Sequence, residues 1–228
     1  MKTNLCDAII LAAGTSKRYS KNNLKQLAKI NGKKLINISI DYFLKEKKIQ
    51  NIYVVVSKQL DINHIKHKSR VIIINGGSTR TKSVYKALCY IDRNTVGNKN
   101  IIIHDCARPC IDISDIKNLI KCSSNLKTGI GLGYPLTNAL KVLNKKLIIT
   151  DNIKRDNMFL SFTPQICNFL KLFDSYKKVV RNNIEVDDEL EAMHINSYKV
   201  KIMISSPRNI KLTYKEDLKV LSDLMVRS

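Results

Sequence analysis

The stretch DAIILAAGTSKR, residues 7–18, decides the fold, because a short apolar run ends abruptly in small and basic residues. A continuous apolar run of this length is typical of a strand buried on both faces of a sheet. Similar runs recur at residues 52–56, 71–74 and 101–104, and helical patterns lie between them at residues 35–45, 79–91 and 113–122. Strands that alternate with helices predict an α/β fold with a Rossmann-like, doubly wound and mostly parallel sheet.

The pattern changes from Gly129 onward. Short strand-like segments separated by turn residues follow at residues 129–134, 140–143 and 147–150. They predict a hairpin-like β-arm, at about residues 135–158, that projects from the domain. A helix near residues 167–180, a strand at residues 200–204 and a last helix from Tyr214 complete the predicted elements. We expect one domain, residues 1–228, that carries the arm.

The chain is strongly basic, with 40 Lys and Arg against 19 Asp and Glu and a net charge of +21. A basic protein invites a nucleic-acid partner. The lysines are nevertheless spread over the whole chain, and the absence of Trp and an aromatic content of 6% leave little for base stacking. We expect no specific nucleic-acid partner and interpret the charge as a solvated basic surface.

The compartment is predicted from apolar runs and cysteines. No apolar run approaches the roughly 18–20 residues of a membrane span, and the N-terminus lacks the pattern of a signal peptide. The six cysteines show no C-x-x-C spacing, which favours reduced thiols. We expect a cytoplasmic protein without membrane attachment.

The turn after the first strand has the composition of a phosphate-binding loop. Ala12, Ala13 and Gly14 are small enough for backbone N–H groups to approach phosphate oxygens, and Gly14 is free to adopt a positive φ. Arg18 and Lys25 add two cations. The stretch is not a Walker A loop, and an ordinary surface turn is the alternative.

A second turn follows the strand at residues 71–74. Gly76 and Gly77 free the backbone to approach a flat ligand, and Ser78 is a candidate N-cap of the next helix. The helix N-terminus behind it favours anions. The alternative is an ordinary strand-to-helix turn with a capping serine.

The third cluster, HDCARP at residues 104–109, ends the strand that precedes it. Asp105 at the carboxyl end of a strand is well placed to hold Mg²⁺ that bridges substrate phosphates. Arg108 is able to pair with Asp105 or to bind a second phosphate. His104 is interpreted as a structural hydrogen-bonding group rather than a base.

Together these clusters resemble the 2-C-methyl-D-erythritol 4-phosphate cytidylyltransferase family of nucleotidyltransferases. Five motifs occur in the family's order: A-A-G…R…K-Q over residues 12–26, G-G-x-x-R-x-x-S-V over residues 76–84, H-D-x-A-R-P over residues 104–109, T-P-Q at residues 163–165 and N-I-K-x-T at residues 209–213. The resemblance implies transfer of CMP from CTP to 2-C-methyl-D-erythritol 4-phosphate, with release of pyrophosphate, in the non-mevalonate route to isoprenoid precursors.

The resemblance also implies roles for individual residues. Arg18 and Lys25 would stabilise charge on the triphosphate, Asp105 would hold Mg²⁺, and Arg155 and Lys211 would position the acceptor phosphate. The nucleotide would be bound by Ala12, Ala13, Gly14, Gly76, Gly77, Ser78 and Ser83, with Arg108 lining the acceptor pocket. In the family the arm reaches across a homodimer, so Arg155 is expected to serve the neighbouring subunit's site.

Four positions depart from the family's pattern. Ser16 replaces the loop's usual second glycine, and Leu24 replaces the proline before the lysine. On the acceptor side, Ala139 and Val186 stand where threonines are usual. Two alternatives therefore stay open: a cytidylyltransferase for another polyol phosphate such as ribitol 5-phosphate, and a basic nucleotide- or RNA-binding protein without turnover.

Overall fold

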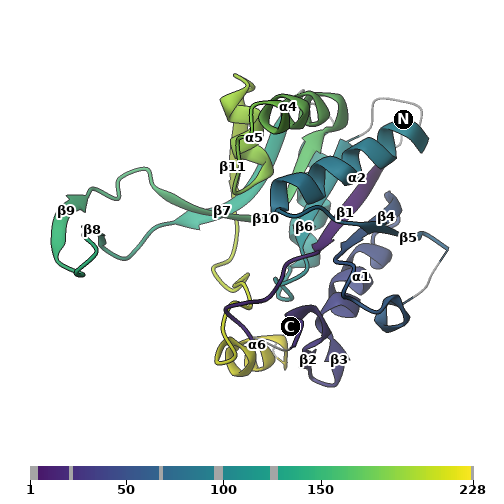
Figure 1. The fold of residues 1–228 in the computed structure, drawn as a ribbon, viewed down its shortest axis with the longest axis horizontal. Coiled ribbons are helices and arrows are strands. Elements are labelled where there is room, and N and C mark those ends of the chain that lie inside the picture. Colours follow the sequence, from purple (N-terminus) through teal and green to yellow (C-terminus); the bar gives the residue numbers. More distant parts are fainter. Residues whose placement is uncertain (1–4, 21–22, 67–68, 95–99, 124–127, 227–228) are drawn as a thin grey trace.

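A seven-stranded sheet forms the centre of the computed structural model, which describes residues 5–20, 23–66, 69–94, 100–123 and 128–226 (Figure 1). Its spatial order is β11 (Val200–Ile204), β7 (Gly129–Pro135), β10 (Phe159–Asn168), β6 (Asn100–Asp105), β1 (Cys6–Ala12), β4 (Ile49–Val56) and β5 (Val71–Asn75). Among these strands only β10 is antiparallel to its neighbours, β6 and β7. The predicted α/β fold with a mostly parallel sheet is confirmed.

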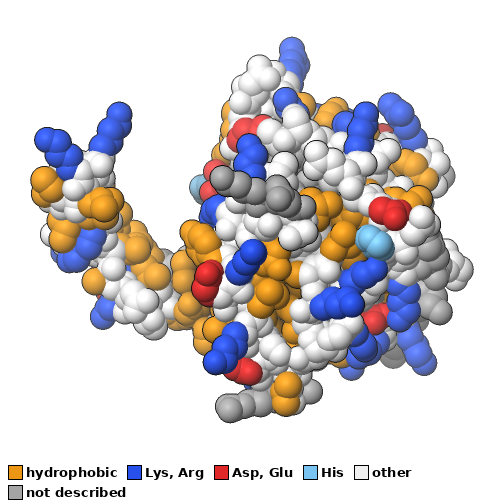
Figure 2. All heavy atoms as spheres, turned by 60° about the horizontal axis from the view of Figure 1, so that its bottom comes forward, with side chains coloured by type: hydrophobic (Ala, Val, Ile, Leu, Met, Phe, Trp, Pro, Cys, Tyr) orange, Lys and Arg blue, Asp and Glu red, His pale blue; other side chains and the backbone are white. Residues whose placement is uncertain are grey.

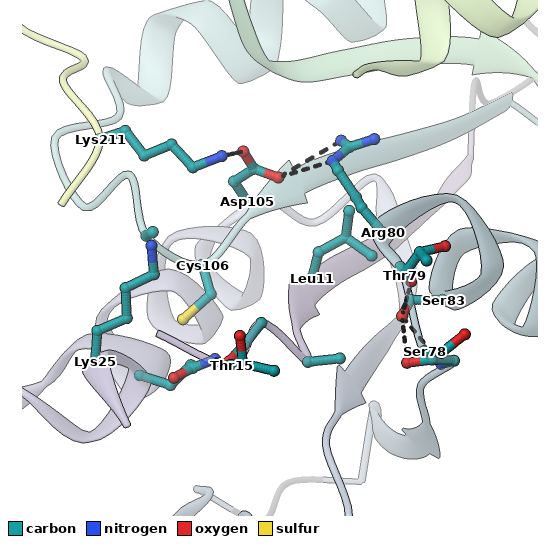
Figure 3. A pocket seen from close by; sticks show the side chains of 15 residues that line it. Leu11, Thr15, Lys25, Ser78, Thr79, Arg80, Ser83, Asp105, Cys106 and Lys211 are labelled. Carbon is teal, nitrogen blue, oxygen red and sulfur yellow. Dashed lines mark hydrogen bonds and ion pairs between the residues drawn. The ribbon is translucent and has the colours of Figure 1, made fainter. Parts of the chain in front are cut away.

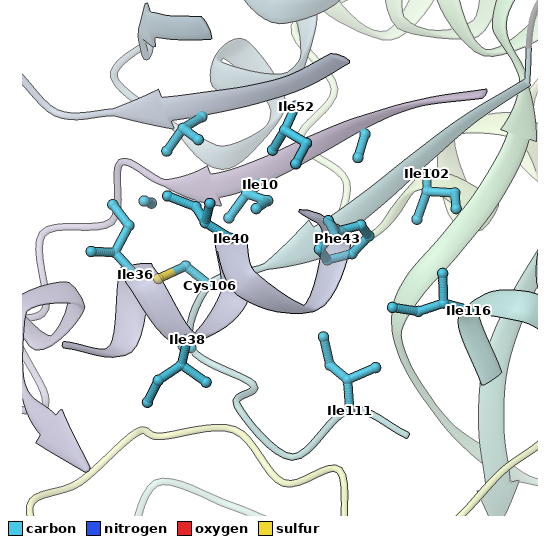
Figure 4. Packing of buried hydrophobic residues seen from close by; sticks show 14 of the residues in the cluster. Ile10, Ile36, Ile38, Ile40, Phe43, Ile52, Ile102, Cys106, Ile111 and Ile116 are labelled. Atoms are coloured by element: carbon cyan, nitrogen blue, oxygen red, sulfur yellow. The ribbon is translucent and has the colours of Figure 1, made fainter. Parts of the chain in front are cut away.

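Helices cover both faces of the sheet. One apolar cluster joins the sheet to α1 (Leu35–Lys45), α3 (Ile113–Ser123) and α6 (Asp217–Val226); the other joins it to α2 (Arg80–Asn94), α4 (Phe169–Arg181) and α5 (Glu189–Ile195). Successive residues of β1 alternate between them, since Ile10 packs in the first cluster (Figure 4) and Ile9 in the second. Burial of β1 on both faces explains its unbroken apolar sequence.

The arm projects away from the body of the molecule (Figure 1). Its far end is a separate antiparallel sheet of β8 (Leu140–Leu143) and β9 (Ile149–Ile153). The assignment of residues 129–134 to the arm is wrong, because β7 is a buried strand of the main sheet between β10 and β11. Every second residue from Gly129 to Gly133 is glycine, which weakens the strand signal, so the place of this segment in the sheet depends on tertiary packing.

Two elements of the main sheet and the helices that cover it were not predicted. The first is β10, which extends through Pro164 with a shift of register between Phe162 and Gln165. Proline in a sequence argues against a central strand, and such a bulge is where one is tolerated. The second is α5, seven residues long and N-capped by Asp188, whose side chain accepts a bond from Glu191 N. The remaining short elements are η1 (Lys25–Leu27), β2 (Lys29–Ile30), β3 (Lys33–Lys34) and η2 (Ile62–His64).

Two expectations from composition agree with the structure. The six cysteines are unpaired, as predicted for reduced thiols. Within the described ranges, no helix combines the length and the apolar character that crossing a membrane requires.

Candidate active site

A cavity of about 300 Å³ opens at the carboxyl ends of β1, β5 and β6 (Figure 3). This is the edge of an α/β sheet where ligands are expected to bind. Eight of the predicted site residues line it: Ala13, Gly14, Lys25, Gly77, Ser78, Ser83, Asp105 and Lys211. The fold thus brings together the loops after β1, β5 and β6 and the segment that carries Lys211, which are far apart in the sequence.

Asp105 lies at the centre of a group of cations. Lys211 Nζ is 2.6 Å from Asp105 Oδ2, Arg80 Nε is 3.5 Å from Oδ1, and Arg108 Nε is 4.0 Å from Oδ2. Figure 3 shows Lys211 and Arg80 approaching the carboxylate from opposite sides. Burial by itself would raise the pKa of Asp105, but Arg80 and Lys211 hold it well below its usual range. The carboxylate is therefore ionised at neutral pH.

Lys25 brings a further cation to the same cavity. Its Nζ donates to the carbonyl oxygen of Leu212 at 3.0 Å. Burial and the neighbouring Lys211 lower the pKa of Lys25, and Arg18 lowers it further. Arg18 is exposed and does not line the cavity, but its charge reaches Lys25. Positive charge thus accumulates on one side of the cavity, which favours a polyanion.

Arg80 was not predicted as a site residue, although it lines the cavity. Its guanidinium spans the two oxygens of Glu189, at 2.9 Å from Oε1 and 3.2 Å from Oε2. Glu189 is fully buried and also accepts a hydrogen bond from Tyr176 Oη at 3.2 Å. The sequence signal for Arg80 was its place in the G-G-x-x-R motif, but nothing local indicates a partner 109 residues away.

The first loop differs from its predicted conformation. Gly14 does not adopt a positive φ; the left-handed residue of this loop is Ser16, with φ of 60°. The serine hydroxyl accepts a hydrogen bond from Lys25 N at 3.1 Å. Hydrogen bonding of the side chain offsets the backbone preference, a contribution that sequence alone did not reveal.

The second loop is fixed by Thr79 and Ser83. Ser78 is not the N-cap of α2, because the helix begins at Arg80 and Thr79 Oγ1 accepts from Lys82 N at 3.2 Å. The Ser83 hydroxyl accepts from Gly77 N at 3.0 Å and donates to Thr79 O at 2.7 Å. These bonds hold the turn rigid at the edge of the cavity.

Gly76 brings the first and second loops together, and its replacement by alanine is expected to destabilise the fold. A Cβ at Gly76 would lie 2.6 Å from the Cβ of Ala13, so Gly76→Ala should lower the free energy of unfolding by about 1–3 kcal/mol. The measurement is urea unfolding. Gly14→Ala is the matched control, because a Cβ there meets nothing closer than 3.9 Å. Equal stability of the two variants would contradict the close approach.

His104 is a structural residue, as interpreted from the sequence. Its Nε2 is 3.1 Å from Arg108 O, and its Nδ1 is 3.1 Å from Thr163 Oγ1. A carbonyl only accepts, so Nε2 carries the proton and Nδ1 accepts from the threonine hydroxyl. Burial lowers the pKa of His104 to about 3. The ring is neutral and both nitrogens are occupied, which leaves no free base.

This neutral histidine makes stability depend on pH. An unfolded histidine has a pKa of about 6.5, whereas the folded pKa of His104 is about 3. Below about pH 6.5 the unfolded chain therefore takes up a proton that the folded chain does not, and stability falls as the pH is lowered. Urea unfolding at pH 7 and pH 5 should show this loss in the wild type and a smaller loss in His104→Gln. An identical loss in both would contradict the assignment.

Five predicted site residues do not line the cavity: Ala12, Arg18, Gly76, Arg108 and Arg155. Ala12 is buried in the core, and Arg108 lies behind Asp105, where its Nη1 donates to Asn209 O at 2.8 Å. Arg108 thus fixes the segment that carries Lys211 and does not line this cavity, and its role in the acceptor pocket stays a prediction. Arg155 is exposed on the arm and donates to the carbonyl of Thr137.

The two acceptor-side departures lie in different surroundings. Ala139 is exposed on the arm. Val186 is 5% exposed and packs in the apolar cluster beneath α2 and α5, so its side chain does not line the cavity. Of these two positions, only Ala139 is therefore exposed where a ligand is able to contact it.

Asp105 is the carboxylate that the cavity offers to a magnesium ion, which would bring substrate phosphates as further ligands. In the part of the chain that the structure describes, no three His, Cys, Asp or Glu residues form a group able to hold a metal ion. Mg²⁺ usually binds one or two carboxylates together with substrate phosphates, and Asp105 supplies one. The protein alone offers no complete cage.

Comparisons with known proteins identify the family of the whole chain. The family model described as IspD, 2-C-methyl-D-erythritol 4-phosphate cytidylyltransferase, matches residues 6–227. A protein of that name from Buchnera aphidicola (Schizaphis graminum) is 33% identical over 217 residues, which cover 92% of this chain and 89% of the relative. One from Blochmanniella pennsylvanica is 31% identical, with coverage of 93% and 91%.

A solved structure shows the same arrangement. The crystal structure of 2-C-methyl-D-erythritol 4-phosphate cytidylyltransferase from Francisella tularensis superposes with a TM-score of 0.85 at 28% identity, covering 96% of this chain and 99% of that chain. The similarity extends over the arm as well as the body, since it spans nearly the whole of both chains. The chain therefore belongs to the 2-C-methyl-D-erythritol 4-phosphate cytidylyltransferase family.

Proposed function

We propose that this protein transfers CMP from CTP to 2-C-methyl-D-erythritol 4-phosphate and releases pyrophosphate, a step of the non-mevalonate route to isoprenoid precursors. The observation that carries the proposal is the cavity itself, where Lys25 and Lys211 converge beside Asp105 at the end of β6. Family membership supplies the identity of the two substrates.

The reaction suits a site without a general base. An oxygen of the acceptor phosphate forms a bond to the α-phosphorus of CTP, and the bond from that phosphorus to the bridging oxygen of the β-phosphate breaks. A phosphomonoester has a second pKa of about 6 and is already largely dianionic at neutral pH. His104 is neutral and fully hydrogen-bonded, consistent with catalysis by positioning and charge stabilisation.

In this proposal the cations bind the phosphates and the second loop binds the base. Lys25 and Arg18 stabilise charge that develops on the triphosphate, and Lys211 positions the acceptor phosphate. The backbone of Gly77 and Ser78, fixed by Ser83, contacts the cytosine. Mg²⁺ held by Asp105 and the phosphates would neutralise part of the phosphate charge.

The arm supplies the acceptor side of a partner's site. It exposes seven large apolar side chains, more than an isolated two-stranded sheet is expected to leave in water: Val142, Leu143, Leu147, Ile148, Ile149, Ile153 and Met158. Phe159 and Leu160, at the adjoining end of β10, are exposed as well. Figure 2 shows apolar side chains along the arm and lysines or arginines at its tip. We infer a homodimer in which the arms bury these residues and Arg155 reaches the neighbouring cavity.

Six unpaired cysteines favour a cytoplasmic, reducing location.

Sedimentation equilibrium tests the homodimer. Wild type should sediment as a dimer, and the double variant Leu147→Asp, Ile149→Asp should shift to the monomer, because charges would replace exposed apolar side chains on the arm. Ile62→Asp, at an exposed isoleucine of the body, is the control that should stay dimeric. A monomeric wild type would refute the proposed shared site.

Pyrophosphate release tests the activity. With CTP and Mg²⁺, we expect release with methylerythritol phosphate and little with ribitol 5-phosphate. Release with ribitol 5-phosphate alone would mean that ribitol 5-phosphate is the acceptor. This acceptor is worth testing because Ala139 stands where a threonine is usual on the acceptor side. No release with either would leave the nucleotide- or RNA-binding alternative.

A further inference from the structure

The phosphate loop and the segment that carries Lys25 are joined by two side chains. The Ser16 hydroxyl accepts from Lys25 N at 3.1 Å and donates to Gln26 Oε1 at 3.1 Å. The Gln26 amide nitrogen in turn donates to Ala12 O at 2.8 Å and to Gly14 O at 2.7 Å. We call these hydrogen bonds of Ser16 and Gln26 the loop brace.

The brace is built into the protein interior. Ser16 is 8% exposed and Gln26 is 2% exposed, so these bonds are largely protected from competing water. Gln26 donates to both carbonyls that flank Ala13, and the hydroxyl of Ser16 is used both as donor and as acceptor. The brace therefore fixes the start of η1, where the Lys25 side chain departs, relative to the loop that faces the cavity.

Ser16 has a backbone conformation that is unfavourable for serine. Its φ of 60° lies in the left-handed region, which favours glycine. Glycine is the residue that the family pattern usually carries at this position. The serine gives up backbone freedom and gains a hydroxyl that touches the Lys25 backbone.

We propose that Ser16 is a positioning residue, specific to chains with serine here, that holds Lys25 in register with the α-phosphate of CTP. The proposal rests on the role of Lys25 proposed above. Ser16 acts through the backbone of Lys25 and contacts no reacting atom. Misplacement of a catalytic group by about 1 Å costs up to about a hundredfold in rate. Hydrogen bonds that hold the backbone of Lys25 in place are therefore expected to raise kcat.

Ser16→Ala and Ser16→Gly separate the hydroxyl from the backbone strain. Alanine removes the two bonds that the Ser16 hydroxyl contributes to the brace and keeps the unfavourable φ, whereas glycine removes the same two bonds and relieves the φ strain. The matched controls are Ser197→Ala and Ser197→Gly, at an exposed serine of the same conformation, φ 62°, outside the cavity. The measurements are kcat, KM for CTP and the melting temperature of each full-length variant.

Both Ser16 variants should lower kcat about tenfold or more, with a smaller change in KM for CTP, although Ser16→Gly melts higher than Ser16→Ala. Both Ser197 variants should keep the wild-type kcat. Wild-type kcat in Ser16→Gly, or an effect on KM alone, would overturn the proposal. If Ser16→Ala does not fold, Ser16→Gly decides, because glycine adopts this backbone freely.

The two proposals fail in different ways. If Lys25→Ala is slow while both Ser16 variants turn over normally, the role of Ser16 is refuted and that of Lys25 stands. If Lys25→Ala turns over normally, the role of Lys25 is refuted and the role of Ser16 falls with it.

Discussion

Lys25→Ala is expected to lower kcat by about a hundredfold or more, because it removes a cation from the place where charge develops on the triphosphate. Loss of one such donor costs about 2.7–4 kcal/mol of transition-state stabilisation in comparable sites. The measurement is steady-state pyrophosphate release at saturating CTP. Stability should change little, since, among the residues that the structure describes, the Lys25 side chain makes a single hydrogen bond, to the carbonyl oxygen of Leu212.

The matched control for this variant is Lys29→Ala. Lys29 is an exposed lysine on β2, four residues further along the chain, and does not line the cavity. Its variant loses the same charge and should keep wild-type kcat. A near-normal rate for Lys25→Ala would remove this lysine from the mechanism, and an equal loss in both variants would indicate a general effect of net charge.

Glu189→Gln is expected to lower the free energy of unfolding by about 3 kcal/mol, because it leaves the Arg80 guanidinium without the carboxylate that it spans. Removal of one partner of a buried ion pair typically costs about 3–5 kcal/mol. Glu189 is fully buried, and its pair with Arg80 joins the start of α5 to the start of α2. Urea unfolding at pH 7 measures the change.

Glu185→Gln makes the same substitution at an exposed glutamate four residues earlier. It should change the free energy of unfolding by less than about 0.5 kcal/mol, as is usual for surface positions. A loss below about 1 kcal/mol in Glu189→Gln would mean that water or a neighbouring side chain replaces the carboxylate.

The sequence predicted the layers of the fold well where burial is two-sided. The apolar runs that became β1, β4, β5 and β6 are continuous, because helices cover both faces of the sheet. The segment that became β7 was expected to be a strand but not to lie in the main sheet, and the proline-containing β10 was not predicted. The places of these two strands depend on pairing with each other and with β6 and β11, which no local pattern reveals.

The sequence placed several charged residues near one another but did not predict the conformation of the loops that carry them. The loops that hold Lys25 and Asp105 were expected at strand ends and do meet there. Three details required the structure: the left-handed backbone at Ser16, the capping role of Thr79, and the pairing of Arg80 with Glu189. Each depends on local backbone geometry or on contacts between residues far apart in the chain. A short sequence motif reveals neither.

Mixed dimers of Lys25→Ala and Arg155→Ala subunits test most directly the central claim, that each CMP-transfer site combines the cavity of one subunit with the arm of its partner. Each variant alone should be nearly inactive with CTP and methylerythritol phosphate. In a mixed dimer, one site contains both substitutions and the other contains neither, so co-refolding the two variants should restore activity well above that of either. Activity that stays at the level of the separate variants, under conditions where co-refolded wild type is active, would contradict the shared site.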